Sequence, residues 1–386
     1  MQNFVLHNPT KIIFGADTVK QIGGETAAFG SKILLVYGKS SIKRNGIYDQ
    51  VVASLSAAGL DIIEHGGVVS NPLLSQVRAG IDKAKKNNIE AVVAVGGGSV
   101  IDSAKAISAG ALVDHDVWQF FKGRKSIRKT LPLTCVLTLA AAGSEMNGGM
   151  VITNEETRHK FGVGNRLLNP KVSILDPTLT FTVPPDYTAF GAVDAIAHIL
   201  EFYFTTRDQS TPVQDRFMEG LVINIMESCD RVLRNPLDYQ GRADLMWSAT
   251  LALNGWTAAG LGMVGFPMHM IEHSLSALYN IAHGAGLSIV MPSWMRYQSR
   301  RHPGKFIVFA QRVFGLTGNN ETCAMEGIKL LENWFVSVKS PTTLGQAGIA
   351  ASDIPFISEN ALALAKIWRL NEYSKDVIME ILAACR

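Results

Sequence analysis

The first half of the chain alternates short apolar runs with amphipathic stretches. Five runs have the pattern of buried strands: Lys32–Tyr37, Asp61–Glu64, Ala91–Val95, Leu133–Thr138 and Val172–Leu175. Helical patterns at Tyr48–Ala58 and at about Ser75–Asn87 separate the first three runs. Because strands that alternate with helices in this order build parallel sheets with helices on their faces, the pattern predicts an α/β fold for this half.

The pattern changes after the pair Pro184 and Pro185. From Tyr187 onward the chain has long amphipathic or apolar helical segments and little strand-like alternation. Examples are Gly220–Leu233, Ala243–Ala259 and Ala361–Leu370. We therefore expect a boundary at these prolines, with an α/β domain over residues 1–184 and an all-helical domain over residues 185–386.

Composition agrees with two domains and narrows the class of protein. A chain of 386 residues is long for one core, and its formal net charge of +3 is spread thinly, so nucleic-acid binding is not expected. No signal-peptide order and no membrane-spanning apolar run is found, so we expect no membrane partner. The cysteines are widely separated and form no CxxC pair: Cys135, Cys229, Cys323 and Cys385. They favour reduced thiols in a cytoplasmic protein over a disulfide framework or zinc ribbon.

One carboxylate and three imidazoles suggest a catalytic metal. Asp194 and His198 are four residues apart, so a helix of about 3.6 residues per turn places both on one face. His269 and His283 follow downstream. Taken alone, the pair at helical spacing is equally typical of ordinary half-buried residues, but an aspartate in an apolar run is costly to bury without a partner. Nitrogen and carboxylate ligands suit zinc or ferrous iron, and the sequence does not choose between them.

Glycine-rich loops follow two of the predicted strands. Gly96–Ser99 opens a helical run, where free backbone N–H groups favour a phosphate, although a tight turn without a ligand has the same pattern. It matches neither GxGxxG nor a P-loop. Gly38–Arg44 carries hydroxyls and cations that suit a second phosphate, or is simply a solvated charged loop. Lys39, where an acidic residue would grip the ribose of NAD, favours NADP.

Together these stretches resemble the iron-containing (group III) alcohol dehydrogenases over essentially the whole chain, and most closely their NADP-dependent aldehyde reductase and butanol dehydrogenase branch. The motifs that carry the resemblance are, in order, Asn8–Gly15, Gly96–Asp102, Thr138–Glu145, Leu175–Pro177, Asp194–His198 and the set His269, His273, His283 and Gly284. Two positions depart from the family pattern: Ala142 replaces a threonine that is usual near the nicotinamide, and Lys39 replaces a glycine common in NADP-using members.

The resemblance implies an α/β domain with a parallel dinucleotide-binding sheet, an all-helical domain that carries the metal and substrate sites, an active site in the cleft between them, and a homodimer. It implies four metal ligands: Asp194, His198, His269 and His283. It also implies a set of cofactor-binding residues: Gly38, Lys39, Ser40, Ser41, Asn71, Gly97, Gly98, Ser99, Asp102, Thr138, Ser144, Asn147 and Lys160.

Two further residues are candidates for catalytic roles. His273, one helical turn after His269, is either a proton relay between the reacting oxygen and solvent or a core histidine. Asp102 either hydrogen-bonds the nicotinamide carboxamide or favours the dipole of its helix.

The expected function is metal-dependent hydride transfer between NADP(H) and a small aliphatic alcohol or aldehyde, with Fe2+ or Zn2+ stabilising the alkoxide. The alternatives are a glycerol-dehydrogenase-like polyol oxidoreductase and a sensor that binds metal and nucleotide without turnover. The pair Asp194 and His198 favours the dehydrogenase over the first, and a simple assay with NADPH and butanal separates it from the second.

Overall fold

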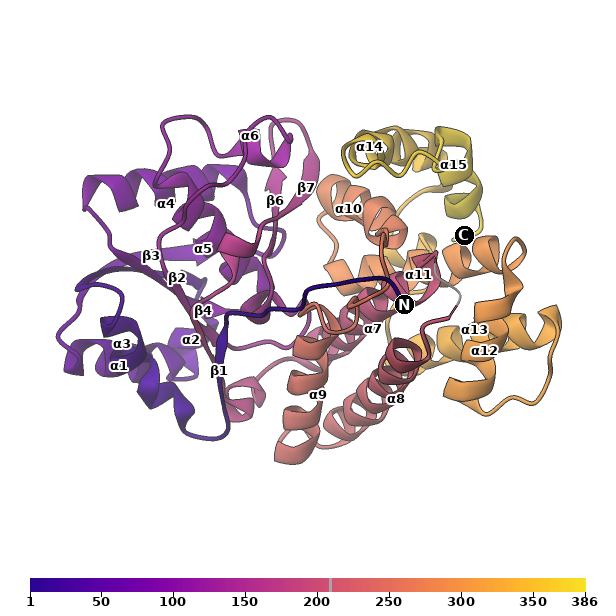
Figure 1. Ribbon diagram of the computed structural model, residues 1–386, viewed down its shortest axis with the longest axis horizontal. Coiled ribbons are helices and arrows are strands. Elements are labelled where there is room, and N and C mark those ends of the chain that lie inside the picture. Colours follow the sequence, from indigo (N-terminus) through magenta and orange to yellow (C-terminus); the bar gives the residue numbers. More distant parts are fainter. Residues whose placement is uncertain (208–209) are drawn as a thin grey trace. The chain divides into compact units, whose positions relative to one another are not determined.

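The computed structural model describes residues 1–207 and 210–386, which form two compact units (Figure 1). The sheet unit consists of His7–Val183 together with Pro236–Thr250. The helical unit consists of Met1–Leu6, Pro184–Asn235 and Leu251–Arg386.

A six-stranded parallel sheet forms the centre of the sheet unit, with strand order β1-β8-β5-β4-β2-β3. Its strands are β1 (Lys11–Phe14), β2 (Lys32–Gly38), β3 (Asp61–Val68), β4 (Ala91–Gly96), β5 (Leu133–Leu137) and β8 (Val172–Leu175). The five strands expected from apolar runs are confirmed. Strand β1 was not expected, because it is a four-residue edge strand whose outer positions are exposed.

Helices cover both faces of the sheet, as the continuous apolar strands require. The helices of the sheet unit are α1 (Ile22–Ala27), α2 (Ser41–Arg44), α3 (Ile47–Ala57), α4 (Leu74–Lys86), α5 (Gly98–Gly110), α6 (Trp118–Phe121) and α9 (Tyr239–Ala252). Ile47, Val51 and Leu55 of α3 recur every four residues and pack with Leu35 and Val93 in one core. Figure 1 shows α1 and α3 on one side of the sheet and α4 and α5 on the other.

A two-stranded antiparallel hairpin lies beside the sheet and was not expected. It pairs β6 (Gly149–Asn154) with β7 (His159–Gly164). Its strands mix glycines with buried polar residues such as Asn154 and Lys160, which hides the alternation typical of a strand.

The helical unit, like the rest of the described chain beyond residue 184, contains helices and no strand. Its helices are α7 (Pro185–Thr205), α8 (Pro212–Arg234), α10 (Pro267–Tyr279), α11 (His283–Ser299), α12 (Pro303–Phe314), α13 (Glu321–Ser337), α14 (Ile354–Ile367) and α15 (Lys375–Ala383). Four of them, α7, α8, α10 and α12, begin at a proline, whose missing N–H costs nothing in the first turn.

Two predicted helices end earlier than expected. The helix expected through Ala259 stops at Ala252, because the Asn254 side chain accepts from the Trp256 N–H and Gly255 adopts a φ of 98°. The helix expected through Leu370 stops at Ile367, and Arg369 has a φ of 57°.

Within the two ranges the structure describes, no helix is long and apolar enough to span a membrane.

Candidate active site

Asp194 and His198 lie one turn apart on α7, the most buried stretch of the helical unit. Their exposed fractions are 4% and 5%, and His198 Nδ1 lies 3.4 Å from Asp194 Oδ1. Asp194, whose burial without a partner would be costly, is thus buried beside an imidazole.

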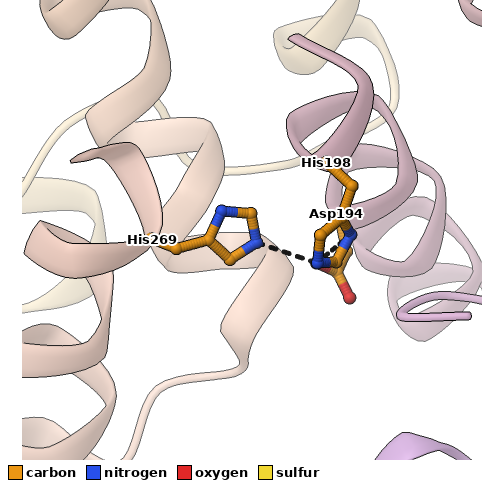
Figure 2. Close-up of side chains that lie close together, drawn as sticks. All are labelled: Asp194, His198 and His269. Atoms are coloured by element: carbon orange, nitrogen blue, oxygen red, sulfur yellow. Dashed lines mark ion pairs between the residues drawn. The ribbon is translucent and has the colours of Figure 1, made fainter. Parts of the chain in front are cut away.

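Two further histidines reach the same carboxylate oxygen from other helices. His269 in the first turn of α10 places Nε2 3.7 Å from Asp194 Oδ1. Figure 2 shows the His269 ring directed toward Asp194 and His198. His283, the first residue of α11, places Nε2 3.6 Å from the same atom. Three helices that are separate in sequence thus converge on Asp194.

Three of these inward-facing atoms are buried and have no hydrogen-bond partner in the described parts of the chain: Asp194 Oδ1, His198 Nδ1 and His269 Nε2. Leaving a buried polar group unsatisfied costs about 1–3 kcal/mol, so three at one point require an explanation. Ligands about 2.1 Å from a tetrahedral zinc lie about 3.4 Å from one another, close to the observed separations. The donor set therefore fits zinc or ferrous iron.

The protonation states in this cluster also suit a metal. Burial works to raise the pKa of Asp194, but the imidazoles of His198, His283 and His269 outweigh it and hold that pKa below its usual range. Burial lowers the pKa of His198 to about 3. Burial would lower the pKa of His269 as well, but the carboxylates of Asp194 and Glu201 raise it to about 9. A cation at this point would replace the proton that those carboxylates attract to His269.

Two carboxylates that were not expected from the sequence lie behind the imidazoles. Glu201 on α7 accepts from His269 Nδ1, and Glu272 on α10 contacts His283 Nδ1. Both carboxylates are fully buried. The available signal was an acidic residue within a strongly apolar helical stretch, the same signal that identified Asp194.

Close packing of α7 and α11 brings His283 to the cluster. A Cβ atom on Gly284 would overlap the backbone carbonyl of Phe190 on α7. Glycine at this position therefore allows the first turn of α11, which carries His283, to approach α7.

His273 lies beside the cluster, one turn after His269 on α10. It is 3% exposed, and its ring centre is 5.5 Å from that of His283 and 5.4 Å from that of Trp368. This position is compatible with both interpretations of His273, the proton relay and the core histidine.

The glycine-rich loop of the sheet unit joins β4 to α5 as expected. Gly97 is the N-cap of α5, and Gly98 and Ser99 form its first turn. A Cβ on Gly97 would lie 3.2 Å from the Cβ of Leu139, so the loop packs tightly on the segment after β5. Thr138 in that segment donates its N–H to the Gly96 carbonyl.

Asp102, Ser144 and Asn147 form one network around a buried lysine. Asp102 accepts from Ser144 Oγ at 2.6 Å and from the Val151 N–H at 2.9 Å. Lys105, fully buried on α5, donates to Ser144 Oγ and to the carbonyl of Asn147. These side chains therefore fix the backbone of the segment between β5 and β6, in addition to any contact that they make with a cofactor. Asp102 lies on the fifth position of α5 and not at its first residue.

The other expected cofactor residues form two further groups. Lys160 Nζ donates to Asn71 Oδ1 at 3.0 Å, both residues are buried, and Asn71 has a φ of 53°. Lys39 and Ser40 lie exposed between β2 and α2, next to Gly38 at the end of β2, and Ser41, also exposed, is the first residue of α2.

Comparison with known proteins identifies the family of the chain. Residues 9–177 match the profile described as iron-containing alcohol dehydrogenase, and residues 188–385 match the carboxy-terminal profile of the same family. The chain is 41% identical to the probable NADH-dependent butanol dehydrogenase 1 of Bacillus subtilis, with all of both chains covered. It is 33% identical to the NADPH-dependent aldehyde reductase YqhD of Escherichia coli, again over all of both chains.

A solved structure shows the same fold. The crystal structure of NADH-dependent butanol dehydrogenase A from Thermotoga maritima superposes with a TM-score of 0.97 and 47% identity, covering 100% of this chain and 99% of that one. The chain belongs to the iron-containing alcohol dehydrogenase family. The expected fold class and the expected enzyme class, a metal-containing alcohol dehydrogenase that uses a nicotinamide cofactor, are thereby confirmed.

Proposed function

We propose that this enzyme transfers a hydride between NADP(H) and a small aliphatic alcohol or aldehyde, at a divalent Fe2+ or Zn2+ held by Asp194, His198, His269 and His283. The observation that carries the proposal is the convergence of three imidazole nitrogens within 3.4–3.7 Å of one buried carboxylate oxygen. Two of those nitrogens, and the oxygen itself, have no other partner in the described chain.

The chain's own residues prepare this site. When bound, the ion would polarise the substrate oxygen as a Lewis acid, and the nicotinamide would carry the hydride. Asp194, which stays ionised, offers an anionic ligand, and His198, which stays neutral near pH 7, offers a free lone pair. His273 is proposed to pass a proton between the substrate oxygen and solvent, and Asp102 to accept a hydrogen bond from the nicotinamide carboxamide.

The preference for NADP(H) is proposed from the charge around the end of β2. Lys39 is exposed there, and Arg44 Nη1 donates to Ser40 Oγ at 2.6 Å, which places a guanidinium beside the loop. The acid on the neighbouring strand, Glu64, is occupied: it accepts from the hydroxyls of Tyr37 and Tyr48. A 2′-phosphate is favoured by such cations, whereas a ribose hydroxyl of NAD needs a free carboxylate.

The substrate class is proposed from the relatives, whose printed names include butanol dehydrogenases and an aldehyde reductase. The test is kcat/KM for acetaldehyde, butanal, hexanal and glyceraldehyde, each with NADPH and with NADH. We expect the largest values for the unbranched aldehydes with NADPH. A preference for glyceraldehyde would favour a polyol oxidoreductase, and a preference for NADH would overturn the proposed cofactor.

A homodimer and a cytoplasmic location complete the proposal. The edge strand β1 and the exposed apolar residues Phe4, Val5 and Leu6 support association with a second copy. The four free, buried cysteines support a reducing compartment.

A further inference from the structure

We infer that Glu201 and Glu272 are positioning residues that set the metal affinity of this site by fixing the orientation and tautomer of His269 and His283. The inference rests on the proposed metal site. It assigns a role to two buried carboxylates that neither contact the point of convergence nor belong to the four expected ligands.

Glu201 holds His269 through two hydrogen bonds. Its Oε1 accepts from the backbone N–H of His269 at 2.9 Å and from the ring Nδ1 at 3.1 Å. A carboxylate oxygen accepts, so Nδ1 keeps its proton when a cation replaces the second one, and Nε2 would then offer its lone pair to an ion beside Asp194. The same bond ties α7, which carries Asp194, to the first turn of α10.

Glu272 has the equivalent role for His283. Its carboxylate contacts His283 Nδ1 and the hydroxyl of Ser276, and the residue is fully buried. This leaves Nε2 of His283 to face Asp194 at 3.6 Å. Gly286 on α11 provides the space, because a Cβ there would lie 2.6 Å from Glu272 Oε1.

Stabilisation of the fold does not by itself account for these two carboxylates. A buried carboxylate is costly to desolvate, and Glu201 Oε2 has no hydrogen-bond partner in the chain as described. A bound cation nearby changes the balance, since a carboxylate behind a metal-bound imidazole raises the basicity of that ligand. Removal of such a partner typically weakens metal binding by about 10–100-fold.

The experiment is a chelator-competition titration of Zn2+ on the purified full-length chain. Glu201→Gln and Glu272→Gln keep a carbonyl oxygen that accepts from Nδ1 but remove the negative charge. We expect each to raise the Kd for Zn2+ by about 10–100-fold. Glu219→Gln is the matched control, because Glu219 is another buried carboxylate of the helical unit, and it accepts from Tyr203 and Arg312. Its Kd should equal that of the wild type even if its melting temperature falls.

A second variant tests position with the charge kept. Gly286→Ala should displace the Glu272 carboxylate, weaken Zn2+ binding and shift the visible absorption of the Co2+-loaded chain. It also covers the case in which a glutamine variant does not fold. Wild-type affinity in folded Glu201→Gln and Glu272→Gln, or in folded Gly286→Ala, overturns the inference. Failure of the wild type to bind one Zn2+ per chain, by contrast, overturns the proposed function itself.

Discussion

Asp194 is the residue on which the proposed centre depends. Its buried oxygen is the common neighbour of His198, His269 and His283, and it remains ionised because those imidazoles outweigh the effect of burial on its pKa. A carboxylate in that setting without a cation would be a net cost to the fold. Its identification from sequence rested on this physical argument, and the burial of the side chain agrees with it.

Removing one ligand should abolish turnover without unfolding the chain. We expect Asp194→Ala and His283→Ala each to lose bound metal and to lower kcat by about 10³-fold or more, because Lewis-acid stabilisation is worth several kcal/mol. Metal content and kcat are measured on the same preparation, with circular dichroism as the check on folding. Full activity with wild-type metal content in either variant would contradict the ligand assignment.

His273→Asn separates the two interpretations of this residue. A proton relay contributes about 10²–10⁴-fold, so we expect kcat to fall within that range while one metal ion per chain is retained. Loss of metal would show instead that His273 supports the ligand set. An unchanged kcat with a lower melting temperature would leave it a purely structural role.

The cofactor prediction concerns Lys39. Lys39→Asp should raise the KM for NADPH and lower that for NADH, because a carboxylate repels a 2′-phosphate and accepts from a 2′-hydroxyl. Lys39→Gln is the control that removes the cation without adding an anion, and should have a smaller effect. A wild-type enzyme that already prefers NADH would refute the argument drawn from this position.

Among the elements, the contact between α7 and α11 is sensitive to the addition of a single methyl group. Gly284→Ala forces the two helices apart at Phe190, so we expect a loss of about 1–3 kcal/mol in unfolding free energy together with weaker metal binding. Gly220→Ala on α8 is the control, since no heavy atom lies within 4 Å of its added methyl group. It should be neutral or stabilising by about 0.5–1 kcal/mol. A Gly284→Ala chain with wild-type stability and metal affinity would contradict this account of α11.

Lys105 joins α5 to the segment between β5 and β6. Its ammonium donates to Ser144 Oγ and to the carbonyls of Asn147 and Gly149, although burial lowers its pKa to about 8. Lys105→Met would leave buried acceptors unpaired, at about 1–3 kcal/mol each, so we expect a marked fall in melting temperature. Lys85→Met, at an exposed lysine of α4, should change stability by less than about 0.5 kcal/mol. Equal melting temperatures for the two variants would show that the buried ammonium is dispensable.

Sequence patterns predicted some helices and strands accurately and missed others, and the difference has physical reasons. Buried parallel strands such as β2 and β4 are continuous apolar runs and were found with nearly correct ends. The β6–β7 hairpin was missed because its polar side chains are buried by tertiary contacts that a local pattern does not contain. The end of α9 depends on a side-chain cap from Asn254, which is equally hidden from hydrophobic periodicity.

For the whole molecule, the sequence predicted the two kinds of architecture and the residues that converge on Asp194. The helical spacing of Asp194 and His198 is local and could be recognised directly, whereas His269 and His283 were placed through the resemblance to the family. Glu201 and Glu272 were not predicted, because their partners are ring nitrogens on other helices or turns. Only the folded helical unit brings each carboxylate behind its imidazole.

The central claim is that one divalent ion at the Asp194 cluster is required for nicotinamide-dependent turnover. The most direct test follows butanal-dependent oxidation of NADPH by the wild-type chain after removal of metal with a chelator, and again after addition of Fe2+ or Zn2+. We expect loss of activity on removal of the metal and recovery at one equivalent of metal per chain, with no recovery in Asp194→Ala. Full turnover by a metal-free wild-type chain would contradict it.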